Sequence, residues 1–556
     1  MWRRTSRDLH ARDTAPSPAT GWLRAVRTSR RILLKGGVLT GAATLAPGSL
    51  TPVDLRSTAA ATPFRDTPFS LGVASGDPLP DGFVIWTRLA VQPLADDGLG
   101  GVSPHSREIR WQVARDERFR YVEASGRAWT GPAEGHSVHV EVHGLRPGRE
   151  YFYRFRTDRE VSPVGRTRTA PDPASYPSSL AMSFASCAQL EHGWFTAYRR
   201  MAEDEPELVL HLGDYLYEYS PGTVPADSGN VRAHEGPETA SLADYRRRHA
   251  QYKTDPDLQL LHATAPWVVV FDDHEVCDNW ADEVPRTAAS VPYFRDRRAA
   301  ALRAYYENMP LRRSAIPRGL EMVAHRRLAW GRLATFHMLD TRQHRDDQSC
   351  GDGMGSCGAE QDAARSILGE SQESWLAEGF AASTATWDFL GQQVPFARMD
   401  TSPTPDERLS MDSWDGYPAC RDRVVRAWQD AGVRNPVVLT GDVHDHLASE
   451  VLSDWEDPSS VLAPELVCTS ITSGGDGHDS DDGRYRWAEQ NPHIRFWTDL
   501  RGYVRTRVTP DSVTADFRCL TGVSRPDQPA FTRASYVIAD GDHALHQVSA
   551  TPLSSL

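Results

Sequence analysis

The chain has 556 residues, a hydrophobic content of 40% and a formal net charge of −14 at pH 7, which is typical of a soluble globular protein of two or three domains. Residues 1–61 carry ten basic and three acidic side chains, a net of +7, so the remaining chain is more acidic still, at about −21. This charge argues against a nucleic-acid-binding surface or a polybasic membrane clamp, and it favours an exported soluble protein or one rich in cation-binding carboxylates.

Residues 1–61 are predicted to be an export signal. "SRRILLK" (29–35) resembles the twin-arginine motif, an apolar stretch comes next, and the small residues of "STAAATPF" offer a cleavage site near 59–61. The apolar stretch is shorter than the roughly 20 residues that span a bilayer, so the mature protein is expected to be secreted and to have no transmembrane segment. The twin-arginine route carries folded proteins, often with metal already bound, which is a first indication of a metal cofactor.

Residues 68–170 are predicted to form a small all-β domain. Short β-branched and aromatic runs alternate with Gly/Pro turns, and "GLRPGREYFYRF" resembles the end of a fibronectin-type sandwich. The Pro- and Ser-rich link "RTRTAPDPASYPSS" is a plausible boundary with the next domain.

Residues 178–540 are predicted to form an α/β domain. Apolar runs such as "ELVLHL", "APWVVVF" and "NPVVLT" alternate with helical stretches such as "DYRRRHAQYK" and "CRDRVVRAWQDAG". Strands that alternate with helices favour a layered domain with a buried sheet.

Polar clusters come directly after four of these predicted strands. They are Ser186 with Cys187, Gly213 and Asp214 with Tyr217, the run from Asp272 and Asp273 to His274 and Glu275, and Asp442 with His444 and His446. Loops beyond the carboxyl ends of neighbouring strands converge, and a thiolate, carboxylates, a phenol and imidazoles are metal ligands. Each cluster alone has an ordinary explanation, such as a turn, a solvated loop, a buried thiol or a helix N-terminus, but four together favour a shared metal site.

The clusters and the runs "PFSLGVASGDP", "PWVVVFDDHEV" and "LDTRQHR" resemble the calcineurin-like metallophosphoesterases, and within them the PhoD-type alkaline phosphatases and phosphodiesterases. Within this family the chain most resembles a secreted, iron-dependent actinomycete phospholipase D that is unrelated to the common HKD-type enzymes. The resemblance implies a four-layer metallophosphoesterase β-sandwich flanked by helices, preceded by the fibronectin-like β domain.

The resemblance also implies two metals. Cys187, Tyr217 and His446 would bind Fe³⁺, and Asp214 would bridge to a second ion. Asp273 and His444 would face that second site, where family members use Ca²⁺ and where Mn²⁺ or Zn²⁺ is an alternative. Asp442 or Asp272 is the further candidate ligand there, and the choice between Asp272 and Asp273 is left open.

The expected chemistry is attack of a metal-bound hydroxide on phosphorus. Asp214 and His274 are the candidate catalytic residues, with His274 as the general acid; a structural or metal-ligating role for this histidine is the alternative. Arg342 is the candidate for binding phosphoryl oxygens, with Arg247 as a second choice.

The resemblance favours a phospholipase D that hydrolyses phosphatidylcholine-type lipids, with transient contact to a lipid surface. The first alternative is an alkaline phosphatase that takes phosphate from monoesters. A metal-stabilised extracellular binding protein is an alternative of another class. The oligomeric state is left open.

Seven cysteines occur in the chain. Cys350 and Cys357 flank the Gly-rich "GDGMGS" and are the predicted disulfide. If Cys187 is a metal ligand, the other six cysteines have room for up to three bridges.

Overall fold

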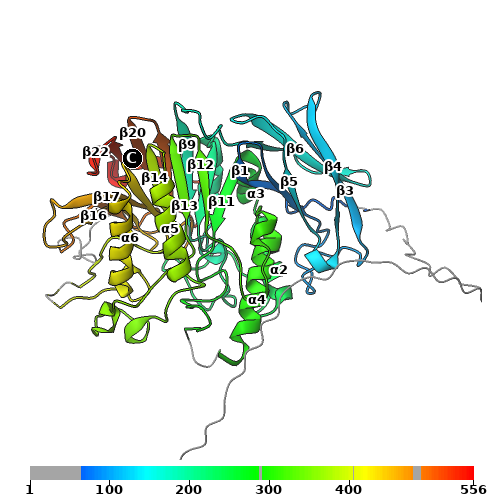
Figure 1. Ribbon diagram of the computed structural model, residues 1–556. Coiled ribbons are helices and arrows are strands. Elements are labelled where there is room, and N and C mark those ends of the chain that lie inside the picture. Colours follow the sequence, from blue (N-terminus) through cyan, green and yellow to red (C-terminus); the bar gives the residue numbers. More distant parts are fainter. Residues whose placement is uncertain are drawn as a thin grey trace, which may run out of the picture. The chain divides into compact units, whose positions relative to one another are not determined.

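The computed structural model describes residues 64, 66–286, 291–402, 404, 406–479 and 490–555 (Figure 1). The export signal predicted for residues 1–61 lies outside them. In the described part of the chain, the helices all fall short of the length and apolar character needed to cross a membrane.

The larger sheet has ten strands, and the strands at its centre are parallel. The central strands are buried along their whole length, which explains why "LVLHL" and "PWVVV" are apolar without alternation. In order across the sheet, the strands are β22 (His546–Ala550), β21 (Ala530–Ala539), β20 (Ser512–Leu520), β19 (Gly502–Val508), β9 (Leu180–Ala185), β10 (Leu208–Leu212), β11 (Pro266–Val270), β1 (Val73–Leu79), β2 (Gly82–Arg88) and β5 (Ser137–Val142).

The second sheet has seven strands, of which β13, β14, β15 and β17 are mutually parallel. Its strands are β12 (Arg326–Trp330), β13 (Ala334–Met338), β14 (Trp387–Gly391), β15 (Pro436–Thr440), β17 (Val461–Val467), β16 (His446–Leu452) and β18 (Ile494–Thr498).

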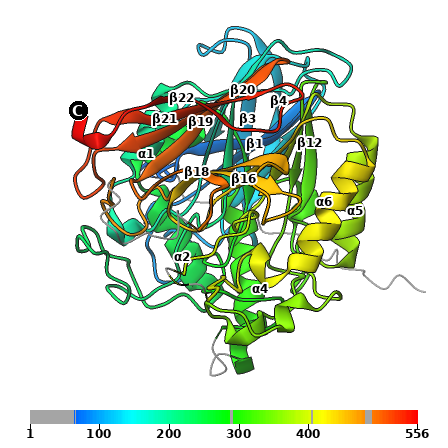
Figure 2. The same ribbon diagram turned by 90° about the vertical axis from the view of Figure 1, so that its left-hand side faces the viewer.

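Helices cover the outer face of each sheet. Ser241 caps the second of them, accepting a hydrogen bond from Asp244 N at 3.2 Å. The helices are α1 (Thr196–Glu203), α2 (Leu242–Lys253), α3 (Pro256–Thr264) and α4 (Val291–Asn308) on the larger sheet, and α5 (Glu370–Ala382) and α6 (Pro418–Asp430) on the second sheet, where they lie alongside each other (Figures 1 and 2).

The two sheets face each other across one apolar core. Phe184 and Leu210 of the larger sheet share this core with Phe336 and Phe389 of the second sheet, and all four side chains are buried. The layers are therefore helix, sheet, sheet and helix, and the predicted α/β fold is confirmed.

Residues 68–170 contribute to two sheets. The strands β3 (Arg107–Ala114), β4 (Val122–Thr130), β6 (Glu150–Thr157), β7 (Glu160–Val161) and β8 (Gly165–Arg168) form a five-stranded sheet. By contrast β1, β2 and β5 extend the ten-stranded sheet, where β1 pairs in parallel with β11. The segment thus shares a sheet with the predicted catalytic domain, which the sequence did not indicate; its fibronectin-like character stays a prediction.

The predicted Cys350–Cys357 disulfide is present. The structure describes all seven cysteines, and the other five are free and buried. The further bridges for which the sequence left room do not form.

Replacing Phe389 by alanine tests the inter-sheet core. Its ring stacks on Phe336 with the centroids 5.1 Å apart. Loss of such a ring should lower the free energy of unfolding by about 3–5 kcal/mol, measured by urea unfolding with tryptophan fluorescence. Val161→Ala, at a side chain that is 46% exposed, is the control, and its effect should stay within about 0.5 kcal/mol. Equal effects of the two substitutions would contradict the proposed core.

Candidate metal centre

The four strand-end clusters meet where the two sheets face each other. β9, β10 and β11 are parallel, so the loops after them leave the same edge of the larger sheet. Cys187 N donates to Gly213 O at 3.2 Å, which joins the first two loops. The loop after β15 approaches from the second sheet, and a Cβ at Gly441 would lie only 2.6 Å from Ser186 Oγ. Both sheets therefore contribute side chains to one centre.

Four of the converging residues have a left-handed backbone. The φ angles are 60° at Cys187, 53° at Asp214, 69° at Asp442 and 63° at His444. Residues other than glycine rarely adopt this conformation, and it costs about 1–3 kcal/mol each, so it gathers at sites that the surrounding structure holds in place. The strain indicates that these turns are shaped to aim their side chains.

The first ligand group consists of Cys187, Asp214 and His444, whose ligand atoms all lie within 4.8 Å of one another. Tyr217 joins it, because its hydroxyl donates to Asp214 Oδ2 at 2.9 Å and lies 3.1 Å from His444 Nε2. Burial lowers the pKa of His444 to about 3, which keeps its imidazole neutral and able to bind a metal.

His446 lies outside this group, which corrects the predicted ligand set. Its Nδ1 accepts a hydrogen bond from Thr469 N at 3.1 Å, and its ring packs against Phe517. In an extended strand, His444 and His446 would face the same side. The left-handed φ at His444 breaks that alternation, so His444 alone turns to Cys187 and Asp214.

Two further groups of potential ligands adjoin the first. Asp272, Asp273 and Asp442 form one, and Asp214, Asp273 and His274 form the other, each again within 4.8 Å. Asp214 belongs to the first group and to one of these, as expected of a residue shared by two metal sites. Asp272 and Asp273 both belong to these groups. The choice between them as the metal ligand, which the sequence left open, therefore does not favour one over the other.

The donor atoms of these groups fit cations. Asp214 Oδ1 and Asp272 Oδ2 are buried and have no hydrogen-bond partner among the described residues. Burial, together with neighbouring carboxylates, raises the pKa of Asp214 and of Asp442 well above their usual range. Burial also raises the pKa of the Cys187 thiol, and Asp214 adds to this effect. Carboxylates crowded without water are stable only with protons or cations beside them.

Arg342 is not free to bind a phosphoryl group, contrary to the sequence prediction. It is fully buried, its Nε donates to Asp272 Oδ1 at 2.5 Å, and its Nη1 and Nη2 each donate to Asp412 at 2.8 Å. The guanidinium therefore balances buried carboxylates. Arg247 pairs instead with Asp96 and Asp244.

His274 lies beside the shared ligands. Its Nδ1 is 2.8 Å from Glu218 Oε2, and its Nε2 is 3.8 Å from Asp273 Oδ2. Burial alone would lower the pKa of His274, but the charges of Asp273 and Glu218 outweigh it and raise the pKa well above its usual value. The carboxylates around His274 thus favour the protonated form of its imidazole.

Glu275 has a positioning role that sequence reasoning missed. Its carboxylate accepts hydrogen bonds from the backbone N–H groups of Asp214 at 3.1 Å, Tyr215 at 2.5 Å and Asp272 at 2.8 Å. It therefore ties the turn after β10 to the turn after β11. The only signal in the sequence was its place at the end of "DDHE".

A cavity of about 660 Å³ opens beside His444. His192, Asp445, Arg501 and residues 224–228 line it. Of the first ligand group, His444 is the member that lines this cavity.

Comparison with known proteins supports a relationship along nearly the whole described chain. The pattern of the PhoD-like phosphatases matches residues 181–517, and the pattern of the PhoD-like phosphatase N-terminal domain matches residues 56–171. Alkaline phosphatase D of Bacillus subtilis (strain 168) is 47% identical over 496 residues, which is 89% of this chain and 85% of that protein. A solved structure described as "Structure of PhoD" superposes with a TM-score of 0.86 at 47% identity, over 88% of this chain and 94% of that chain.

The two histidines provide a matched test of the first ligand group. His444→Gln should lose most of the metal of that group, because it removes a ligand. His446→Gln should retain the metal, since glutamine offers an acceptor to Thr469 N in place of the ring. Elemental analysis of the purified variants measures this difference, and metal loss in His446→Gln alone would restore the original prediction.

Proposed function

The chain belongs to the PhoD-like phosphatase family and is a metal-dependent phosphoesterase, and from this premise we propose that it hydrolyses phosphomonoesters, with activated phosphodiesters as a second class of substrate. The observation that carries the proposal is that Asp214 and Asp273 link the adjoining ligand groups. Asp214 lies with Cys187 and His444 and also with Asp273, and Asp273 lies with Asp272 and Asp442. Two cations at neighbouring sites suit displacement at phosphorus.

Hydrolysis of phosphatidylcholine, the main expectation from the sequence, gains no support. The 47% identical relative is named an alkaline phosphatase, which favours the first alternative. Membership of a phosphatase family also sets aside the alternative of a metal-stabilised binding protein. Contact with a lipid surface stays a prediction.

The proposal assigns Fe³⁺ and Ca²⁺ to the two ligand groups. A thiolate, a phenolate, an imidazole and a carboxylate, from Cys187, Tyr217, His444 and Asp214, suit Fe³⁺. The carboxylates of Asp272, Asp273 and Asp442 suit Ca²⁺, which prefers oxygen ligands. When bound, the two cations would activate water, hold the phosphoryl oxygens and neutralise developing negative charge.

His274 is proposed to deliver a proton to the leaving group. Glu218 fixes its Nδ1, so its Nε2 faces the ligand carboxylates. His274 Nε2 makes only the longer contact, 3.8 Å to Asp273 Oδ2, whereas all three guanidinium nitrogens of Arg342 are hydrogen-bonded to Asp272 and Asp412. The substrate would enter through the cavity beside His444.

The proposal includes export by the twin-arginine route. The motif and the small-residue cleavage site of residues 29–61 support it. A phosphatase outside the cell would release phosphate from external esters.

The proposed function predicts a substrate order and a need for metal. Turnover of p-nitrophenyl phosphate should exceed choline release from phosphatidylcholine by at least about tenfold, equivalent to about 1.4 kcal/mol in the barrier. Dialysis against a chelator should abolish turnover, and Ca²⁺ should restore it while iron remains bound. Preferential choline release would reinstate the phospholipase, and undiminished turnover after complete metal removal would exclude the two-metal mechanism.

The general-acid role of His274 predicts dependence on the leaving group. His274→Asn should slow hydrolysis of glycerol phosphate, whose alkoxide needs a proton, by about 100- to 10,000-fold. Hydrolysis of p-nitrophenyl phosphate should fall much less, because that phenolate leaves unprotonated. Steady-state kinetics at equal metal content measure both. Equal losses for the two esters would point instead to a structural or metal-ligating histidine.

A further inference from the structure

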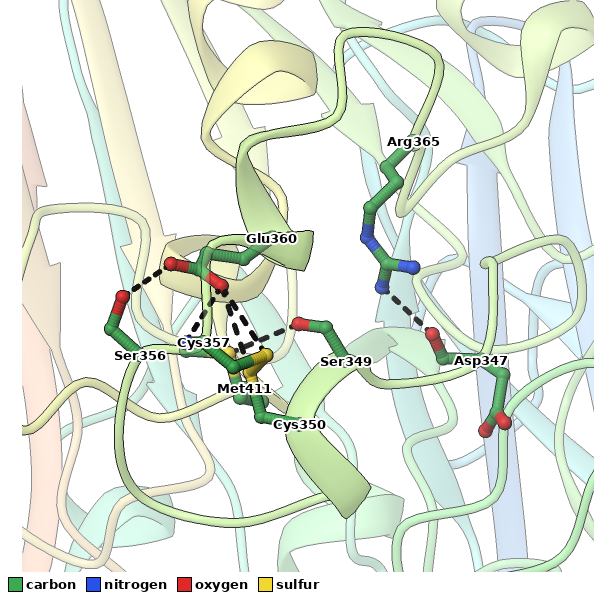
Figure 3. Close-up of a disulfide and its surroundings, with 8 residues drawn as sticks. All are labelled: Asp347, Ser349, Cys350, Ser356, Cys357, Glu360, Arg365 and Met411. Atoms are coloured by element: carbon green, nitrogen blue, oxygen red, sulfur yellow. Dashed lines mark hydrogen bonds between the residues drawn. A yellow bond between two sulfur atoms is a disulfide. The ribbon is translucent and has the colours of Figure 1, made fainter.

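A disulfide-closed loop is connected by hydrogen bonds to the ligand group formed by Asp272, Asp273 and Asp442. The Cys350–Cys357 bond closes the loop (Figure 3). Residues 350, 351 and 352 at its start are all left-handed, with φ of 58°, 77° and 56°. Left-handed residues ordinarily occur singly, so a run of three persists only where the chain around it is held.

Asp352 connects this loop to Asn279. Asn279 Nδ2 lies 3.2 Å from Asp352 Oδ1 and 3.3 Å from Oδ2, and Arg286 Nε lies 3.1 Å from the second oxygen. The Asp352 side chain is 13% exposed, so this contact is largely shielded from water. Asn279 is itself left-handed, with φ of 47°.

Asn279 in turn orients a carboxylate of the metal centre. Its backbone N–H donates to Asp273 Oδ2 at 2.8 Å. Asp273 Oδ1 has no hydrogen bond among the described residues. The bond from Asn279 therefore fixes one oxygen of Asp273, while the other, 3.5 Å from Arg342 Nη2, keeps a lone pair that no hydrogen bond uses.

A second connection reaches the same group from the residues before the loop. Gln348 Nε2 donates to Asn279 O at 2.9 Å and to Asp412 Oδ1 at 2.7 Å. Asp412 also accepts a hydrogen bond from Arg342, and the same guanidinium donates to Asp272. The far side of the loop differs, because Ser356 and Cys357 N donate there to Glu360 (Figure 3).

From these contacts we infer that the disulfide-closed loop positions Asp273 through Asp352 and Asn279, and so sets the affinity of the Asp272, Asp273 and Asp442 group for a divalent cation. Asp352 and Asn279 are positioning residues, and outer residues of this kind alter metal affinity by about 10- to 100-fold. The Cys187, Asp214 and His444 group does not depend on this loop. The inference rests on the proposed second cation site.

The test compares two variants that break the connection between the loop and Asp273 with one control variant in the same loop. Cys350→Ser with Cys357→Ser opens the loop. Asn279→Gly removes only the side-chain bond to Asp352, and glycine retains the left-handed backbone that donates to Asp273. Ser356→Ala, on the Glu360 side, is the matched control. The iron-containing proteins are freed of loosely bound cations with EGTA and titrated with CaCl₂, while the melting temperature and the iron content are measured.

The Ca²⁺ concentration that gives half of the full stabilisation should rise about 10- to 100-fold in the double cysteine variant and in Asn279→Gly. It should match wild type in Ser356→Ala, with the iron content unchanged in all three. If the double cysteine variant and Asn279→Gly both respond to Ca²⁺ as wild type does, the inference is wrong. A wild-type protein that hydrolyses phosphate esters but does not respond to Ca²⁺ would overturn it and leave the enzymatic function intact. Absence of both hydrolysis and Ca²⁺ response would overturn the two together.

Discussion

Negative charge buried between two sheets is the constraint around which this fold is arranged. Asp214, Asp272, Asp273 and Asp442 lie close together, and one buried guanidinium, that of Arg342, faces only part of their charge. Keeping such ions away from water costs several kcal/mol each unless a partner compensates. Cations supply that compensation, so the centre that performs the chemistry also relieves the strongest electrostatic repulsion in the domain.

The same constraint explains why the turns at the strand ends are rigid. A ligand cage is effective only if it is formed before the substrate arrives, because reorganising charged groups during the reaction raises the barrier. Here Glu275 ties two turns together by accepting hydrogen bonds from three backbone N–H groups. In addition, four of the residues that converge on the centre have a left-handed backbone. Part of the folding energy is thus spent on strained turns, and the packed sheets beneath them supply it.

The sequence indicated the architecture and the location of the centre, because both depend on local patterns. Continuous apolar runs such as "PWVVV" identify buried parallel strands, and polar residues at their ends must meet at one edge. The choice between His444 and His446 depended on one backbone angle that the residue types do not reveal. The role of Arg342 depended on Asp412, 70 positions away along the chain. The pairing of β1 with the large sheet could not be predicted either, since strand propensity does not specify the partner strand.

The pairing of β1 with β11 bears on how this polypeptide is made. On the ribosome, β1 emerges roughly 190 residues before the strand that will lie parallel to it, and β9 waits even longer for β19. Until then, the growing chain presents open strand edges that invite wrong pairings with other nascent chains. The sheet therefore closes only after its late strands have been made. Export after folding, as the proposed twin-arginine signal implies, would let the whole sheet close in the compartment where the chain is synthesised.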